Sequence, residues 1–155
     1  GTIDSNIRYG KPEITDAQVK EAAEVAQATE FIDTKPEKYK SPVSQGGTNV
    51  SGGQKQRLSI ARAIAKDPEI FIFDDSFSAL DFKTDSQLRK ALKEYTKDAT
   101  TVIVAQRIST ILGADQIIVL DDGHMEGIGT HKELMANCEV YQQIARSQLS
   151  EEELA

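Results

Sequence analysis

Residues 49–57 read Asn-Val-Ser-Gly-Gly-Gln-Lys-Gln-Arg, and residues 70–75 read Ile-Phe-Ile-Phe-Asp-Asp. These two stretches decide the fold. Ser51 is followed three residues later by Gln54, which is the spacing of a helix capping box. Apolar residues then recur at helical spacing as far as Ala65. The first stretch therefore predicts a helix that begins just after Ser51.

The start of this helix is suited to an anion. The N–H groups of a first helical turn have no partner inside the helix, and the helix dipole adds positive character there. Gly52 and Gly53 lack a Cβ, so an oxyanion can approach the main chain closely. The same residues also suit a capped helix after a flexible turn, and the motif alone leaves both interpretations open.

The second stretch favours a ligand site. Residues 70–73 form a continuous apolar run between Pro68 and the acidic pair Asp74 and Asp75. Such a run is typical of a strand buried on both faces in a parallel sheet. Ligands of open α/β sheets bind at the carboxyl ends of the strands, where a carboxylate suits Mg²⁺ held together with phosphates. Together the two stretches predict one nucleotide site.

Several ordered segments carry a family resemblance. Residues 49–65 resemble the signature motif of ABC-type ATPases, residues 70–74 their Walker B strand, and residues 78–81 their D-loop. The resemblance continues through the switch strand and loop at residues 101–110 and on to residues 127–134. It covers nearly the whole chain and is closest to the nucleotide-binding domains of bacterial multidrug and lipid exporters.

The resemblance implies part of an ABC-type P-loop NTPase fold, of the α/β class. We expect a helical signature subdomain over residues 1–66. A remnant of the RecA-like core is expected over residues 67–155, with a mainly parallel sheet and flanking helices. The alternation of strand and helix patterns beyond Asp75 independently predicts the α/β class.

Caps, periodicity and turn residues predict the remaining elements. A Thr-x-x-Gln box at residues 15–18 predicts a helix over residues 16–30, and residues 31–47 are predicted to be an irregular loop. Asp122-Gly123 predicts a hairpin turn. Further elements are expected as a helix starting near Thr84, strands at 101–105, 116–120 and 124–128, a short helix at 107–112, a helix after a Thr130–Glu133 box, and a helix at 139–148.

Composition limits the classes of function. The 155 residues suit one domain, and a net charge of −7 without a basic block argues against nucleic acid as a partner. The single cysteine, Cys138, has no internal disulfide partner and is expected to be a buried apolar residue in a reducing compartment. No apolar run is long enough to span a membrane, so the chain itself is expected to be soluble.

The sequence contains no Gly-x-x-x-x-Gly-Lys-Ser/Thr loop, since Gly10-Lys11 is followed by Pro12. In the family, a run similar to Gly1-Thr2-Ile3 lies just beyond the Q-loop, which follows the Walker A loop. The resemblance therefore implies a fragment whose first third, with Walker A, is missing. We expect such a fragment to be inactive on its own.

Two residues depart from the pattern of active family members. Asp75 follows the Walker B aspartate, where a glutamate usually acts as general base. The shorter side chain draws the carboxylate back by about an ångström, and a displacement of that size can cost about 10²-fold in rate. Gln106 replaces the switch histidine that senses the γ-phosphate, and an amide cannot carry charge. The resemblance thus implies a degenerate site that binds ATP and Mg²⁺, with Asp74 as metal ligand, and rarely hydrolyses.

The same resemblance implies a heterodimer of two nucleotide-binding domains arranged head to tail. Ser51, Gly52, Gly53 and Gln54 would bind ATP in the competent site of the partner. Asp81, in the D-loop, would connect the two sites, and it also suits a helix N-cap. The transmembrane domains of an exporter would be the other partner, and the location would be the cytoplasmic face of the plasma membrane.

Two alternatives to an exporter ATPase stay open. A soluble ABC ATPase of the repair or translation kind would need nucleic-acid partners, and the acidic balance and the exporter-like loop at residues 43–47 count against it. A non-hydrolytic regulatory domain is suggested by Asp75 and Gln106.

Overall fold

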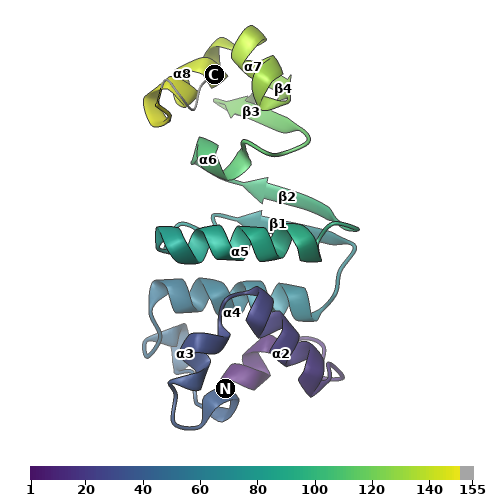
Figure 1. Ribbon diagram of the computed structural model, residues 1–155, viewed down its shortest axis with the longest axis vertical. Helices are drawn as coiled ribbons and strands as arrows, with labels where there is room; N and C mark the ends of the chain where they lie inside the picture. Colours follow the sequence, from purple (N-terminus) through teal and green to yellow (C-terminus); the bar gives the residue numbers. More distant parts are fainter. Residues whose placement is uncertain (151–155) are drawn as a thin grey trace. The chain divides into compact units, whose positions relative to one another are not determined.

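The computed structural model describes residues 1–150 and forms two compact units, the first over residues 1–102 and the second from residue 103 onward (Figure 1). The functional boundary expected after residue 66 stays a prediction. Within residues 1–150, no helix combines the length and apolarity that a membrane crossing requires. The first unit contains α1 (Ile3–Ile7), α2 (Asp16–Val25), α3 (Thr29–Asp33), the 3₁₀ turns η1 (Lys38–Lys40) and η2 (Gln45–Gly47), α4 (Gly52–Ala65), β1 (Ile70–Asp74) and α5 (Phe82–Tyr95).

Helix α4 is the element against which the N-terminal helices pack. Its capping box is present as predicted: the Ser51 hydroxyl accepts from the Gln54 N–H at 3.2 Å, and the Gln54 side chain accepts from the Ser51 N–H at 3.1 Å. α1 and α2 both lie against this helix (Figure 1). The buried face of α4 consists of Leu58, Ile60, Ala61, Ile64 and Ala65.

Helix α2 ends earlier than the sequence predicts. The predicted helix over residues 16–30 is wrong beyond Val25, because Gln27 has a φ of 56° and leaves the helical region. The N–H of Ala28 donates to the carbonyl of Ala23 at 2.7 Å, and the N–H of Gln27 donates to that of Glu24 at 2.9 Å. These two bonds form a Schellman motif, which here lacks the glycine that usually marks it in a sequence. The predicted loop at 31–47 accordingly contains the end of α3 and the two 3₁₀ turns.

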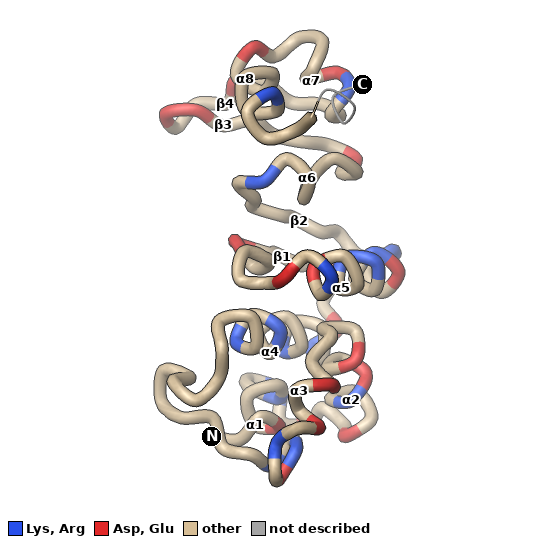
Figure 2. The backbone as a smooth tube through the Cα atoms, turned by 60° about the vertical axis from the view of Figure 1, so that its left-hand side comes forward, with Lys and Arg blue, Asp and Glu red and all other residues tan. Residues whose placement is uncertain are grey.

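Helix α5 begins two residues before Thr84, where the sequence predicted a start. Asp81 is the N-cap of this helix, which confirms the structural role predicted for it beside its role in the D-loop. Leu88 and Leu92 are buried on one side of the helix. Basic and acidic residues both lie along the rest of it (Figure 2).

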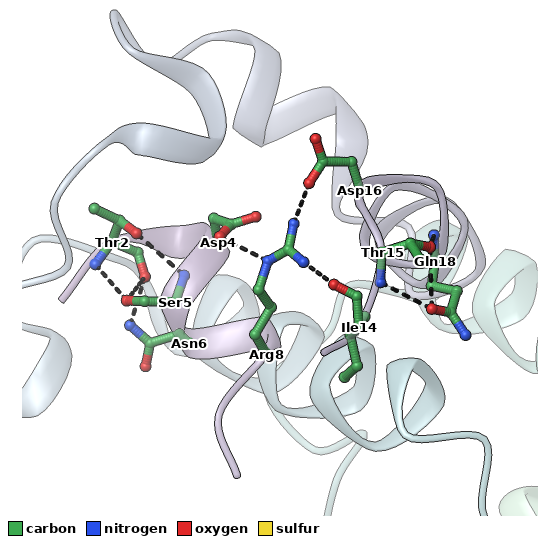
Figure 3. Close-up of polar contacts among 9 residues, drawn as sticks. All are labelled: Thr2, Asp4, Ser5, Asn6, Arg8, Ile14, Thr15, Asp16 and Gln18. Carbon is green, nitrogen blue, oxygen red and sulfur yellow. Dashed lines mark hydrogen bonds and ion pairs between the residues drawn. The ribbon is translucent and has the colours of Figure 1, made fainter. Parts of the chain in front are cut away.

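Arg8 ties the start of α2 to α1. Its Nε donates to the Asp4 carboxylate at 2.9 Å, and its other nitrogens donate to the Ile14 carbonyl and the Asp16 carboxylate (Figure 3). Figure 3 also shows the capping boxes that begin both helices. Because an arginine fork can hold several acceptors in a fixed geometry, this one residue orients the two helix starts.

Strand β1 is buried on one face only. Phe71 and Phe73 are buried, with ring centroids 5.9 Å apart, whereas Ile70 and Ile72 are 59% and 70% exposed. The prediction that both faces are buried is therefore wrong, because no element among residues 1–150 covers the side that carries the two isoleucines.

The expected α/β class is confirmed, but the strands do not form a single sheet. β1 pairs with β2 (Thr100–Val104), the strand that crosses the division between the units, and β3 (Ile117–Asp121) pairs with β4 (His124–Gly129). The helix that joins β1 to β2 is the connection typical of a parallel pair. The described strands thus form two sheets of two strands each.

The second unit is a hairpin packed against helices. β3 and β4 are antiparallel, and the predicted turn is confirmed, with φ values of 43° at Asp122 and 79° at Gly123. The Thr130–Glu133 capping box is also confirmed, and Cys138 is buried as predicted. The remaining elements are α6 (Ile108–Ile111), α7 (His131–Asn137) and α8 (Glu139–Gln148), and the bounds predicted in this unit agree within one residue. The core comprises Ile108, Ile117, Val119, Leu134, Cys138, Tyr141 and Ala145.

Replacing Leu88 by alanine tests the packing of α5. Leu88 is fully buried, so we expect Leu88→Ala to lower the free energy of unfolding by about 2–5 kcal/mol in urea denaturation followed by circular dichroism. Ser86→Ala, at an exposed position of the same helix, is the control and should stay within about 0.5 kcal/mol. A Leu88→Ala variant as stable as the control would contradict the described packing.

Candidate nucleotide site

The signature helix begins in close contact with the turn that follows β1. A Cβ added to Gly53 would lie 3.0 Å from the carbonyl oxygen of Ala79, whereas one added to Gly52 would lie 3.5 Å from the Ala79 Cβ. The first separation is too short for an unstrained side chain, and the second is ordinary van der Waals contact. A side chain at Gly53 would therefore require the Ala79 carbonyl to shift by a few tenths of an ångström, so glycine here favours the close approach of the two segments.

Asp74 and Asp75 lie at the carboxyl end of β1, where the sequence placed them. Both are exposed. Asp75 has a φ of 46°, which is uncommon for a residue other than glycine. Its Oδ2 accepts from the Ser78 hydroxyl at 3.1 Å. The carboxylate expected to work as a shortened base is therefore engaged by its own turn.

Asp74 fits one role in a magnesium site. Within residues 1–150, no group of three or more His, Cys, Asp or Glu side chains is placed to hold a metal ion. Magnesium at phosphate sites is usually bound by one or two carboxylates, with waters and phosphate oxygens completing the shell. A single exposed carboxylate at a strand end matches that donor set, so Asp74 is suited to serve with a nucleotide and not as part of a protein cage.

Asp81 binds the start of α5 through both carboxylate oxygens. Its Oδ1 accepts from the Thr84 N–H at 3.0 Å, and its Oδ2 accepts from the Thr84 hydroxyl at 2.7 Å. These hydrogen bonds favour the charged form and lower the pKa of Asp81 below the usual aspartate range. The D-loop thus ends in a carboxylate that is fixed by the helix it caps.

Gln106 belongs to the second unit, whereas α4 and β1 belong to the first. Its side chain is exposed in the loop between β2 and α6. Its carbonyl accepts from Nε2 of Gln148 at 2.9 Å, and Oε1 of the same glutamine accepts from the Ile108 N–H at 2.9 Å. The last turn of α8 therefore holds the main chain of the switch loop. No sequence signal pointed to this role, since Gln148 belongs to no motif.

The predicted site residues are divided between the two units. Ser51, Gly52, Gly53 and Gln54 form the first turn of α4 and its cap, and this turn lies against the segment between Asp75 and Asp81. Gln106 is placed with the second unit. The resemblance assigns the signature residues to the site of a partner, whereas it assigns Asp74, Asp75 and Gln106 to this chain's own site, so the residues expected there come from both units.

The two signature glycines should respond differently to alanine. Gly52→Ala meets only ordinary contact, and alanine leaves the unfolded chain less conformational freedom than glycine does, so this variant should be at least as stable as the wild type. Gly53→Ala should be the less stable of the two, because its Cβ presses on the Ala79 carbonyl. Urea denaturation of both variants gives the comparison, and the reverse order would contradict the described contact.

The cap at Asp81 should make stability depend on pH. Because folding lowers the pKa of this carboxyl, its contribution is present above the pKa of the unfolded chain and is lost as the pH falls through the folded value. The stability advantage of the wild type over Asp81→Asn should therefore be largest near neutral pH and shrink in acid. Urea midpoints measured across that range test this, and an advantage that is independent of pH would refute the charged cap.

Comparison with known proteins gives a consistent family. The ABC transporter family matches residues 2–78. An uncharacterized ABC transporter ATP-binding protein of Mycobacterium bovis is 46% identical over 151 residues, which are 96% of this chain and 26% of that protein. A proposed multidrug export ATP-binding/permease protein of Staphylococcus aureus is 46% identical over 143 residues, or 92% of this chain and 25% of that protein.

A solved structure agrees with these relatives. The structure of a bacterial Atm1-family ABC exporter with ATP bound superposes with a TM-score of 0.90 at 36% identity, covering 97% of this chain and 26% of that one. The chain thus spans about a quarter of the length of the proteins it matches. Sequence motifs, fold and relatives agree that the chain belongs to the ABC transporter family.

Proposed function

We propose that this chain is the signature-bearing part of the ATP-binding subunit of an ABC exporter, which couples ATP binding and hydrolysis to the export of a substrate. The observation that carries the proposal is the match of nearly the whole chain to an ATP-bound exporter, with a TM-score of 0.90. The name of the Staphylococcus aureus relative supports export as the direction of transport.

The proposed site residues divide between two ATP sites. Ser51, Gly52, Gly53 and Gln54 would contact the nucleotide of a partner domain, because their exposed helix start offers N–H groups and the positive end of a dipole. In the chain's own site, Asp74 would hold Mg²⁺, which supplies positive charge beside the phosphates when bound. Asp75 and Gln106 would line that site, and Asp81 would link the two.

The proposed architecture follows the same division. Residues 1–66 would form the helical subdomain that meets the transmembrane domains, and residues 67–155 would belong to the catalytic core. The partner would be a second nucleotide-binding domain that differs from this one, since Asp75 and Gln106 argue against a symmetrical pair of active sites. The complex would lie at the cytoplasmic face of the plasma membrane. The net charge of −7 supports partners other than nucleic acid.

A non-hydrolytic regulatory domain is the second candidate. It is favoured by the hydrogen bond from Ser78 to the Asp75 carboxylate, because a carboxylate held by its own turn is poorly placed to orient an attacking water. In that case ATP binding alone would change the conformation of the complex.

Restoring the two family residues tests the proposal. In the full-length subunit, assembled with its natural partner, we expect Asp75→Glu combined with Gln106→His to raise ATP hydrolysis at this chain's own site by up to about 10²-fold. Steady-state phosphate release in the presence of Mg-ATP is the measurement, and Asp75→Asn with Gln106 unchanged is the matched control that cannot restore a base.

The outcomes separate the two candidates. A wild-type complex that hydrolyses ATP and transports supports the exporter, and a further rise on restoration supports the degenerate site. A rate unchanged by the double substitution would reject the degenerate site. A complex that binds ATP but hydrolyses none of it, before or after restoration, would reject the ATPase and favour the regulatory domain.

A further inference from the structure

We propose that Gln56 is a positioning residue that fixes the turn after β1 to the signature helix. The segment that carries Asp75 and the signature motif would then move together. This inference rests on the proposed function, in which Asp75 serves this chain's own ATP site and the signature motif serves that of the partner. Gln56 would thus connect one site mechanically to the other.

The side-chain amide of Gln56 makes three hydrogen bonds to the turn. Its Nε2 donates to the carbonyl oxygen of Asp75 at 3.1 Å and to the hydroxyl oxygen of Ser78 at 3.0 Å. Its Oε1 accepts from the N–H of Ala79 at 3.0 Å. An amide has two N–H donors and an oxygen acceptor, so both of its groups are used. The turn is therefore held at three points by one residue of α4.

A second contact lies one helical turn earlier. Gly53 and Gln56 are three residues apart and so lie on the same face of α4. Gly53 leaves space for the Ala79 carbonyl, which a Cβ there would approach to 3.0 Å. Gln56 binds the N–H of the same residue, Ala79. The helix that begins with the signature glycines is therefore joined to the D-loop over a full turn, by close packing at one end and by hydrogen bonds at the other.

The backbone conformation of Asp75 explains why the contact with Gln56 matters. Asp75 has a φ of 46°, and a non-glycine residue stays in that region only where its surroundings hold it. Gln56 donates to the carbonyl of that same residue, and Ser78, which also binds Gln56, donates to its carboxylate. The direction of the Asp75 side chain thus depends on a residue of the signature helix.

The chemistry of Gln56 suggests two informative variants. Gln56→Met keeps the length of the side chain and removes all three hydrogen bonds. Gln56→Glu keeps the acceptor for Ala79 but removes both donors, and it places a carboxylate opposite the Asp75 carbonyl. Gln87→Met, at an exposed position of α5, is the matched control for the change of residue type.

Hydrogen exchange in this chain directly tests the hydrogen bonds between Gln56 and the turn after β1. We expect Gln56→Met to speed exchange of the Ala79 N–H by roughly tenfold, because its hydrogen-bond acceptor is gone, and Gln56→Glu to speed it less. Exchange within the buried part of α4, at Ile64, should be unchanged and shows that the variant is folded. An Ala79 exchange rate equal to that of Gln87→Met would overturn the proposal.

The catalytic consequence is tested in the full-length subunit with its partner. We expect Gln56→Met to lower kcat for ATP hydrolysis by up to about 10²-fold while the KM for ATP stays within about twofold, since the variant disturbs position and leaves the phosphate contacts in place. The kcat of Gln56→Glu should fall between those of the wild type and Gln56→Met. A kcat unchanged in Gln56→Met, with faster exchange at Ala79, would overturn the positioning role. A wild-type complex without ATP hydrolysis would instead reject the proposed function. The exchange measurement would still decide whether Gln56 holds the turn after β1.

Discussion

The first unit depends on the burial of one face of α4. Leu58, Ile60, Ala61 and Ile64 are all buried, and the helices before α4 in the sequence pack against it. The same helix begins with two glycines whose main chain is open, so the element that supplies the core also presents the candidate phosphate contacts. Since α4 is fixed along its length by packing and at its start by Ser51, its first turn can offer N–H groups in a set direction without a ligand to order them.

Strongly local signals were predicted well from the sequence. The caps at Ser51 and Thr130, the Asp122-Gly123 turn and the bounds of α8 all depend on residues close in the chain, and the structure confirms each of them. The end of α2 was missed because Gln27 adopts a left-handed conformation that glycine or asparagine usually marks. The second face of β1 was predicted to be buried because residues 70–73 are all apolar. An apolar run shows that both faces of a strand are suited to burial, but it does not show whether the described chain contains an element that covers each face.

In the candidate site, too, features that depend on local sequence were predicted and contacts between distant residues were not. The candidate site residues were located by their resemblance to family motifs, but the contacts that hold them in place were not predicted. Gln56 and Gln148 bind main-chain groups far away in the sequence, and nothing in the local sequence distinguishes such a glutamine from one on a solvated helix face. Arg57 is similar: its Nη1 donates to the Gln27 carbonyl at 2.7 Å and its guanidinium lies 4.9 Å from the Phe31 ring centre. Burial lowers the pKa of Arg57, so its surroundings are those of a packed residue and not of a free surface charge.

The contact between Gln148 and the switch loop has a practical consequence for work on this protein. The residue that holds the Gln106 carbonyl and the Ile108 N–H lies in the final turn of α8, near the end of the described chain. An affinity tag or fluorescent protein fused directly to the end of this helix would therefore begin next to the side chain that holds the switch loop. The exposed Asp122-Gly123 turn offers a position for a label that makes neither of these two hydrogen bonds.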